Sequence, residues 1–450
     1  MAQPKLPEGV FSFLDTDLYK LTMQCAILKY FPSVDVEYKF TNRTPQMRLD
    51  LEAVAWLREQ IAKLGNITLE QQELQFLRKH CPYLTADYLE YLQKFQLRPN
   101  EQVHLEFKPV DGPYGDLHIT VSGLWVETIL YEIPLLALTS QAYFKFIDRD
   151  WDYDGQEEQA YEKGVRLFSA GCVVSEFGSR RRRDFHSQDL VIKGLVRASH
   201  EKDLPGKLSG TSNVYFAMKY SIPPVGTVAH EWYMGIAALT GDYEHANENG
   251  LRYWLDCFGK GVLGIALTDT FGTPDFFKAF KKRIPARTSA SRDNSTGYTD
   301  ESHPATDQPS YAEVFAGIRQ DSGDPKEYIK NADAFYKSIG VANKSIVFSD
   351  ALNVEKCIEY RALAEASGFK PSFGVGTFFT NDYKHKSNPE TKSKPMNIVI
   401  KLSKAGGRPA IKLSDNIGKN TGDEETVIDV KRRLGYTEKE WRGGDESKRW

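Results

Sequence analysis

Three consecutive stretches of the chain share one pattern: residues 317–325 read GIRQDSGDP, residues 345–353 read SIVFSDALN, and residues 371–380 read PSFGVGTFFT. Each begins with a short apolar run typical of a buried strand and closes in polar or glycine residues, and helical stretches of ten or more residues separate them. Repeated strand-then-helix units favour a parallel sheet or barrel, where functional groups gather at the carboxyl ends of the strands. The polar clusters therefore lie where a site is expected.

The same pattern begins at about residue 150. Further strand ends are predicted in CVVSEFGSRRRR (172–183), TVAHEWYMG (227–235) and GIALTDTFGT (264–273). Between residues 281 and 310 the chain is almost devoid of apolar residues and rich in Ser, Thr, Asp and Pro. This segment is predicted to be a flexible surface insertion that the chemistry does not need, because it cannot bury a core and closing a longer loop costs little.

The first part of the chain predicts helices packed on an antiparallel sheet. Apolar residues recur at helical spacing over 13–31, behind the polar turn at 15–17, and again over about 50–100, whereas 36–44 and 104–125 alternate like strands. From about residue 381 the alternating stretch MNIVIKL, followed by AIKLSD, resembles a hairpin that rejoins this first sheet.

Composition bounds the class of protein. The chain has 450 residues, 41% hydrophobic and 26% charged, with a formal net charge of -3, which fits two or three globular domains and predicts no nucleic-acid partner. Five scattered cysteines without a CxxC pair indicate a reducing compartment rather than a disulfide framework or structural zinc. No secretory signal is visible, and Glu127 and Glu132 interrupt the most apolar stretch, so neither export nor a membrane span is predicted. The expected location is the cytosol.

Several well-known sequence motifs are absent, or their residues do not have the required spacing. No GxxxxGK[ST] occurs. Gly259, Gly261 and Gly264 match GxGxxG, but they precede a predicted strand, whereas a dinucleotide loop follows one. His230 and Glu231 resemble the start of a zincin helix, but Met234 stands where the second histidine is needed. The sequence therefore disfavours a P-loop, a dinucleotide loop and zinc hydrolysis.

Groups suited to anions remain on separate strand ends. Residues 180–183 are four arginines, each able to make forked hydrogen bonds to phosphate or carboxylate, although a solvated basic helix start has the same pattern. The segment 319–324 (RQDSGD) suits a magnesium-bound sugar phosphate, and equally a capped helix start. In 373–377 (FGVGT) the glycines offer backbone N–H groups to a phosphate, although most such turns are only turns.

Taken together, these motifs resemble the nicotinate phosphoribosyltransferases of the type II phosphoribosyltransferase superfamily, and in detail their fungal branch. The resemblance covers nearly the whole chain except 281–310. Its motifs are FLDTDLYKLTMQ, YEIPLLAL, SEFGSRRRR, GTSNV, GTVAHEWYMG, LTDTFGT, RQDSGDP, SDALNVEK, FGVGTFFTND and NIVIKL.

The resemblance implies an irregular α/β barrel of the quinolinate phosphoribosyltransferase type, packed on an α/β open sandwich built from both termini. The expected domains are a sandwich domain over 1–145, a catalytic barrel over 146–380 that carries the insertion, and a C-terminal segment over 381–450 that returns to the sandwich.

The implied reaction joins nicotinate to 5-phosphoribosyl-1-diphosphate, giving nicotinate mononucleotide and diphosphate, with ATP hydrolysed to ADP and phosphate. It is the first step of NAD salvage from nicotinate. Mg²⁺ is the implied cofactor and ATP a co-substrate. The cytoplasm is the implied location with the nucleus as a second candidate, and a homodimer is one expected assembly.

Site residues follow from the matching motifs. His230 corresponds to the histidine that this family phosphorylates from ATP, with Asp269 as the group that orients its imidazole. Asp321 is expected at the ribose hydroxyls or magnesium, and Arg319 at the nicotinate or phosphate. The other expected substrate contacts are Ser349, Gly376 and Thr377 at the 5-phosphate, Arg180 at the diphosphate or carboxylate, and Phe177 and Tyr19 beside the ring. Tyr19 serves either its own site or that of a neighbouring subunit.

Two rival functions stay open. A nicotinamide-using relative shares TDxYK, HEWYMG and DSGDP but carries Asp where this chain has Ser212, and a carboxylate there accepts a hydrogen bond from a carboxamide yet repels nicotinate. Ser212 therefore favours the acid substrate. A catalytically silent binding protein on the same scaffold is expected to have lost Arg319, Asp321 or His230, and this chain keeps all three.

Overall fold

The middle of the chain is built on a parallel sheet. The computed structural model describes residues 7–285, 308–416 and 420–436. Six strands pair in parallel in the order β6-β5-β10-β9-β8-β7. They are β5 (Val173–Glu176), β6 (Lys207–Thr211), β7 (Ile265–Leu267), β8 (Gly317–Gln320), β9 (Ser345–Phe348) and β10 (Lys370–Val375).

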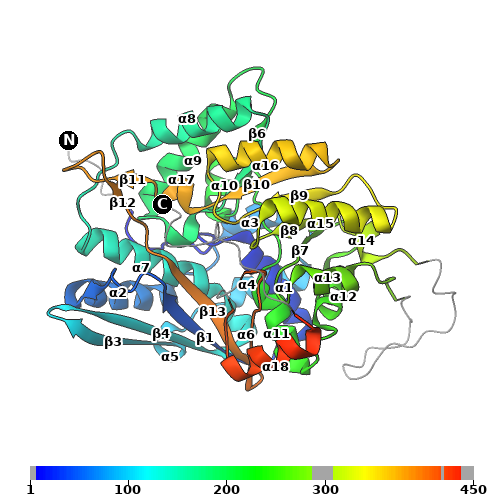
Figure 1. The fold of residues 1–450 in the computed structure, drawn as a ribbon. Helices are drawn as coiled ribbons and strands as arrows, with labels where there is room; N and C mark the ends of the chain where they lie inside the picture. The colour runs from blue at the N-terminus through cyan, green and yellow to red at the C-terminus, as the bar shows by residue number, and fades with distance from the viewer. Residues whose placement is uncertain (1–6, 286–307, 417–419, 437–450) are drawn as a thin grey trace.

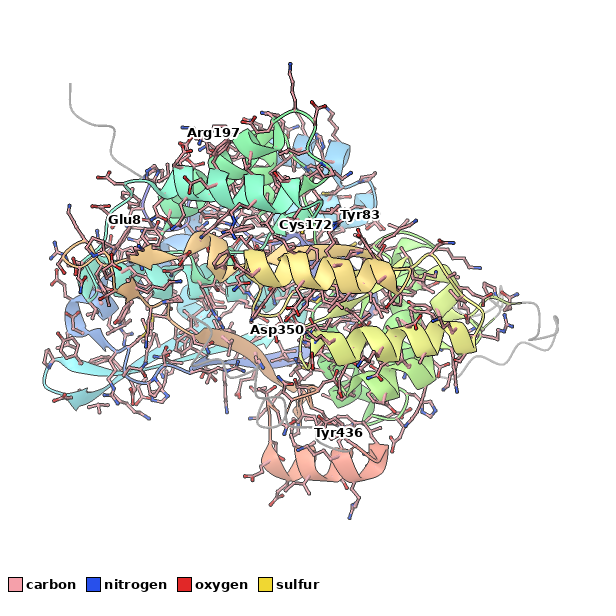
Figure 2. All side chains as sticks on the ribbon, turned by 45° about the horizontal axis from the view of Figure 1, so that its top comes forward. Glu8, Tyr83, Cys172, Arg197, Asp350 and Tyr436 are labelled. Atoms are coloured by element: carbon pink, nitrogen blue, oxygen red, sulfur yellow. The ribbon has the colours of Figure 1, made fainter. Side chains whose placement is uncertain are left out.

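This sheet confirms the expected mixed α/β class with parallel strands. Over the residues that the structure describes, β6 and β7 end the path and share no pairing, so strand pairing does not close a ring. The intervening helices are α8 (Gln156–Ser169), α9 (Phe185–Ser199), α10 (Val214–Tyr220), α11 (His230–Thr240), α12 (Ala246–Phe258), α13 (Thr273–Phe280), α14 (Tyr311–Val314), α15 (Pro325–Ser338), α16 (Val354–Ala366) and α17 (Thr377–Thr380). Figure 2 shows α15 and α16 side by side.

One predicted strand end is wrong. Residues 227–235 form no strand: an isolated bridge at Pro224 is followed by an irregular run, and His230 is the first residue of α11. Pro223 and Pro224 lack the N–H groups that a longer ladder beside Thr211 needs, and Ala229 already occupies the cap position of α11. The strand in this part of the sheet is instead β6, which ends in the GTSNV motif.

A second, antiparallel sheet combines both ends of the chain. Its order is β14-β13-β1-β4-β2, with β3 also paired to β4. The strands are β1 (Asp35–Asn42), β2 (Leu49–Asp50), β3 (Val103–Asp111), β4 (Tyr114–Leu124), β13 (Ile398–Ala405) and β14 (Arg408–Pro409). Figure 1 shows β13, in orange, alongside the blue β1. A C-terminal strand thus completes the N-terminal sheet.

The predicted C-terminal hairpin is only partly correct. Gly406 and Gly407, both with positive φ, make its turn, but the second arm is just Arg408–Pro409. Residues 410–415 leave the sheet, and the amide of Leu413 donates to the carbonyl of Thr270 beside the parallel sheet. This departure brings Lys412 to the site described below.

The remaining helices cover the two sheets. They are α1 (Leu18–Tyr30), α2 (Leu51–Lys63), α3 (Gln71–His80), α4 (Ala86–Lys94), α5 (Pro99–Gln102), α6 (Trp125–Thr128), α7 (Glu132–Phe146) and α18 (Glu424–Leu434), with 3-10 turns η1 (Leu64–Asn66), η2 (Ile129–Tyr131) and η3 (Ser179–Arg181). A short pair, β11 (Tyr383–Lys384) and β12 (Lys392–Ser393), lies outside both sheets. None of the helices in the described ranges is both long and apolar enough to cross a membrane.

Most of the predicted insertion lies outside the described residues, which omit 286–307. Its two ends are described and lie together: the amide of Ile284 donates to the carbonyl of Pro309 at 2.9 Å, and that of Tyr311 to the carbonyl of Lys282 at 3.1 Å. That the chemistry does not need this segment stays a prediction.

Candidate active site

One cavity of about 250 Å³ borders both halves of the molecule. Its wall includes the carboxyl ends of the parallel strands, the first turn of α11, and residues 399–402 of β13. Ten of the residues predicted from sequence line it, namely Tyr19, Phe177, Arg180, Ser212, His230, Arg319, Asp321, Ser349, Gly376 and Thr377. Tyr19 therefore borders the cavity of its own chain.

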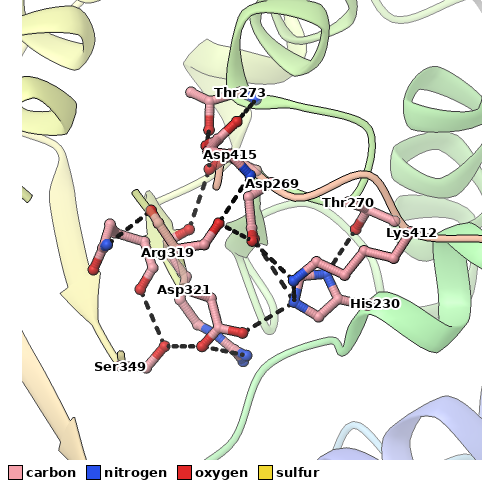
Figure 3. A network of polar contacts seen from close by, with 12 residues as sticks. His230, Asp269, Thr270, Thr273, Arg319, Asp321, Ser349, Lys412 and Asp415 are labelled. Carbon is pink, nitrogen blue, oxygen red and sulfur yellow. Dashed lines mark hydrogen bonds and ion pairs between the residues drawn. The ribbon is translucent and has the colours of Figure 1, made fainter. Parts of the chain in front are cut away.

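His230 lies among four polar neighbours (Figure 3). Its Nδ1 lies 3.0 Å from Thr270 Oγ1, and its Nε2 lies 2.8 Å from Lys412 Nζ and 3.0 Å from Asp321 Oδ2. An ammonium can only donate and an ionised carboxylate can only accept, so Lys412 and Asp321 compete for Nε2: the ring accepts from Lys412 when Nε2 is unprotonated and donates to Asp321 when Nε2 carries the proton. Burial, and then the Lys412 charge, hold the pKa of His230 below its ordinary value. The lowered pKa favours the neutral imidazole, which keeps a lone pair on one of its two ring nitrogens.

Asp269 does not orient the imidazole directly. Its Oδ1 lies 3.7 Å from His230 Nε2, beyond hydrogen-bond distance, whereas its Oδ2 lies 3.0 Å from Lys412 Nζ and accepts from Ser322 Oγ at 2.5 Å. The side chain is only 1% exposed. Asp269 thus acts on His230 through Lys412, whereas the next residue, Thr270, contacts the ring directly at Nδ1.

Asp321 is held in its ionised form. Ser349 Oγ donates to Asp321 Oδ1 at 2.7 Å, and Arg319 NH2 lies 3.5 Å from the same oxygen. Burial alone raises the pKa of Asp321, but Arg319, His230 and Lys412 outweigh it and hold that pKa well below its ordinary value. Asp324, three residues on, instead accepts from the amide of Lys326 and caps α15. The RQDSGD motif is therefore both a site element and a helix start.

Of the four arginines 180–183, two line the cavity and two are buried in the core. Arg180 and Arg181 line the cavity. Arg182 is buried and makes a forked pair with Asp15 at 2.8 and 2.6 Å. Arg183 is also buried, between the rings of Phe144 and Tyr383. The ability to make forked hydrogen bonds to a carboxylate is confirmed for Arg182, but its partner is Asp15 of the core, and neither Arg182 nor Arg183 lines the cavity.

Ser212 and Phe177 form a tightly packed part of the wall. Ser212 Oγ donates to Asp17 Oδ1 at 2.8 Å, and Ser179 Oγ donates to the same oxygen at 2.7 Å. Asp17 occupies the cap position of α1 but makes no side-chain cap, since its carboxylate serves these hydroxyls. A Cβ on Gly374 would lie 2.3 Å from the Phe177 ring, so glycine is required there for the ring to fit.

Comparison with known proteins adds a decisive observation. The profile described as the nicotinate phosphoribosyltransferase (NAPRTase) family matches residues 172–438, and that of the NAPRTase N-terminal domain matches residues 14–140. The chain belongs to the nicotinate phosphoribosyltransferase family. Both sheets and the cavity between them fall within the matched ranges.

Individual relatives agree over nearly full length. A Schizosaccharomyces pombe protein named "Probable nicotinate phosphoribosyltransferase" is 50% identical over 95% of this chain and 98% of its own. A Saccharomyces cerevisiae nicotinate phosphoribosyltransferase is 46% identical over 98% of both chains. A solved Porphyromonas gingivalis nicotinate phosphoribosyltransferase has a TM-score of 0.81 at 33% identity and covers 95% of this chain and 100% of its own.

Three metal-ligating side chains lie close together at the cavity, where the family resemblance implies Mg²⁺. His230, Asp269 and Asp321 bring one ligand atom each within 4.8 Å of one another. Lys412 Nζ contacts two of these groups, so a cation already lies among them. Mg²⁺ prefers oxygen ligands, and the ionised Asp321 borders the cavity. Asp321 alone fits magnesium, and the three-residue cluster does not.

Four basic residues line the cavity but were not among the site residues predicted from the sequence. Arg43, Lys401 and Lys412 come from β1, β13 and the segments that follow these strands, and Arg181 follows Arg180. Arg181 also donates to Asn397 Oδ1 at 2.7 Å. The arginine run was the only signal for any of them. The other three lie outside the strand-end motifs: the pairing of β1 with β13 places Arg43 and Lys401 at the cavity, and the departure of residues 410–415 from the sheet brings Lys412 there.

A buried carboxyl beneath the cavity gives a pH-dependent prediction. Glu176 accepts from Thr211, Gln188 and the amide of Gly178, yet burial raises its pKa to about 7. The folded state therefore binds a proton that the unfolded state, with a pKa near 4.5, releases. Its contribution to stability is complete below pH 4.5 and is lost as the pH rises through 7, which costs at most about 3 kcal/mol.

Glu176→Gln is expected to remove this loss, because the amide cannot ionise. Denaturant unfolding at pH 5, 6, 7 and 8 should show a flatter stability profile for this variant than for the parent. Glu162→Gln, at an exposed position of α8, is the matched control and should keep the parent slope. Parallel profiles for all three proteins would contradict the prediction.

Proposed function

We propose that this protein transfers the 5-phosphoribosyl group of 5-phosphoribosyl-1-diphosphate to nicotinate, with ATP hydrolysis coupled to the transfer. The observation that carries the proposal is the cavity itself. It collects Arg180, Arg319, His230 and Asp321 in a chain whose near-full-length relatives are named nicotinate phosphoribosyltransferases. A silent binding protein is disfavoured, since the groups that chemistry needs share one wall.

In the transfer, the pyridine nitrogen forms a bond to C1 of the ribose while the bond from C1 to the diphosphate oxygen breaks. The electron pair leaves with diphosphate, and positive charge develops on the ribose in an oxocarbenium-like transition state. Asp321 would hold Mg²⁺, which would supply positive charge to stabilise the leaving diphosphate. Asp321 also places a fixed negative charge near the developing cation. The residues bind, orient and stabilise charge, and none need form a covalent bond to the sugar.

In this proposal, basic residues bind the phosphate groups and aromatic rings border the pyridine ring. Arg180, Arg181, Arg43 and Lys401 line the wall where diphosphate is expected, and guanidinium groups suit its oxygens. Tyr19 and Phe177 border the expected position of the pyridine ring. Gly376 and Thr377 are assigned to the 5-phosphate. Ser349, predicted for the same phosphate, donates to Asp321 and is better placed to orient that carboxylate.

ATP is assigned to His230. Its neutral imidazole carries a lone pair and is suited to accept the γ-phosphoryl group, with ADP as the leaving group. Water later hydrolyses the phosphohistidine and releases phosphate. Lys412, already against Nε2, provides a cation for the added phosphoryl charge. Cytoplasmic or nuclear location and formation of a homodimer stay predictions from the sequence.

A single assay tests the proposal. The protein is incubated with 5-phosphoribosyl-1-diphosphate and Mg²⁺, with labelled nicotinate or labelled nicotinamide, and with or without ATP. The expected result is nicotinate mononucleotide, formed faster with ATP and accompanied by ADP. Exclusive use of nicotinamide would favour the alternative nicotinamide phosphoribosyltransferase. If neither base yields a nucleotide, the remaining interpretation is a binding protein without catalytic activity.

The preference for acid over amide is predicted to depend on Ser212. Ser212→Asp places a second carboxylate against Asp17, whose pKa burial already raises, and adds negative charge at the cavity wall. The nicotinate kcat/KM should fall by about 10- to 100-fold. Ser212→Ala removes only the hydrogen bond and should lose far less. Equal losses for the two variants, or an unchanged kcat/KM in Ser212→Asp, would exclude a role of charge at this position.

A further inference from the structure

A fully buried ammonium lies just behind the cavity wall. Lys20, on α1, has no exposed surface. Its Nζ contacts Glu231 Oε2 at 2.5 Å and forms a second ion pair with Glu132 Oε2. Two carboxylates outweigh the effect of burial and raise the pKa of Lys20, so it stays charged. One cation thus sits between two anions from distant parts of the chain.

Each partner of Lys20 is attached to a group of the cavity. Glu231 follows His230 in α11, and Glu132 Oε1 lies 3.7 Å from Arg180 NH1. Lys20 itself follows Tyr19. Glu132, Glu231, Arg180, His230 and Tyr19 all line the cavity, whereas Lys20 does not. The buried Lys20 ammonium therefore connects three parts of the cavity wall: Tyr19 through the chain, Arg180 through Glu132, and His230 through Glu231.

The first turn of α11 is anchored to the N-terminal half at the same place. Trp125 Nε1 donates to Glu231 Oε1 at 2.7 Å, and the Tyr38 hydroxyl donates to the same oxygen. One turn further on, a Cβ on Gly235 would lie 2.2 Å from the Trp125 ring, so the helix and the indole are in direct contact. Glu231 is thus held by three donors, of which Lys20 alone carries charge.

We propose that Lys20 is a positioning residue for the transfer reaction: it neutralises Glu132, which leaves Arg180 available to substrate anions, and it fixes Glu231 at the start of α11. Without the ammonium, Arg180 is the one cation left in an ion pair with Glu132 among the described residues, and the 3.7 Å separation between them can close to a direct hydrogen bond. Arg180 is half exposed in the present geometry and has room to move. This inference rests on the proposed function.

Lys20→Met keeps a similar length and removes the charge. The affinity for inorganic diphosphate, measured by calorimetry, should fall by about 10-fold, and KM for 5-phosphoribosyl-1-diphosphate should rise in parallel. Lys29→Met is the matched control, because Lys29 lies on the same helix in an exposed pair with Asp256. It should leave both quantities unchanged. All measurements are made well below the melting temperature of each variant.

Two double variants separate positioning from stability. Lys20→Met/Glu132→Gln and Lys20→Met/Glu231→Gln each remove one buried carboxylate, so both relieve the unpaired charge. Only the first releases Arg180, and only it should restore diphosphate affinity to within about three-fold of the parent. Equal rescue by both, or rescue by neither, would overturn the proposal.

If Lys20→Met does not fold, the single variants Glu132→Gln and Glu231→Gln test the proposal instead. With Lys20 present, Glu132→Gln should tighten diphosphate binding by about three-fold, since Arg180 loses its nearest carboxylate, whereas Glu231→Gln should not change it. The same affinity in both variants and the parent would contradict the proposal. A parent protein that neither forms nucleotide nor binds diphosphate would instead overturn the proposed function.

Discussion

Asp321→Asn should lower kcat/KM for nucleotide formation by about 10²- to 10³-fold, the effect typical of removing one preorganised charge from a buried site. The amide keeps the shape of the side chain and its bond from Ser349, but it removes the negative charge that the proposed mechanism uses to stabilise the oxocarbenium ion. It also removes the one oxygen ligand of the cavity cluster that fits Mg²⁺. Steady-state rates across a magnesium titration measure both effects.

Asp324→Asn is the control for this substitution. It lies in the same motif but caps α15, where asparagine caps nearly as well. Its rates should stay within a few-fold of the parent, and circular dichroism should show both variants folded. Parent rates in Asp321→Asn throughout the magnesium titration would remove Asp321 from the mechanism.

His230→Ala should abolish ATP hydrolysis and the stimulation by ATP, yet retain slow, ATP-independent transfer from 5-phosphoribosyl-1-diphosphate. His230 offers a neutral imidazole nitrogen at this wall, beside Lys412 and Thr270, and alanine provides no phosphoryl acceptor. Labelling with γ-³²P-ATP should leave acid-labile label on the parent protein and none on the variant.

The matched control is His245→Ala, because His245 is exposed and pairs with Asp242 away from the cavity. It should keep both the label and the coupling. ATP hydrolysis that continues in step with nucleotide formation in His230→Ala would show that another group accepts the phosphoryl. Loss of the basal transfer together with the coupling would show that His230 also takes part in the glycosyl step.

The sequence predicted the part of the site that strand ends carry. Apolar runs that close in polar residues, repeated with helices between them, specify parallel strands, and the carboxyl ends of parallel strands meet at one edge. Arg319, Asp321, Ser349, Gly376 and Thr377 all lie on or directly after such strands, and all reach one cavity. The same reasoning failed for His230, which the sequence placed at a strand end and the structure places at the first turn of α11.

The resemblance to a known family supplied roles that spacing alone could not assign. His230 has the pattern of an ordinary buried histidine, and 180–183 that of a basic helix start. Only the structure showed that Arg182 and Arg183 belong to the core, paired with Asp15 and enclosed by aromatic rings. A run of like residues contains no signal for which members face a cavity, because that depends on the neighbours that the fold brings to each.

The sequence by itself therefore determined the parallel sheet, the return of a C-terminal strand and the polar strand ends, since each follows from local periodicity. Tertiary structure decided the contacts of Lys412 with His230 and Asp269, and the burial of Lys20 between Glu132 and Glu231. These pairs join segments far apart in the chain. A charge acquires its partner, and its pKa, only when packing removes water from both, and no local pattern of residues encodes that step.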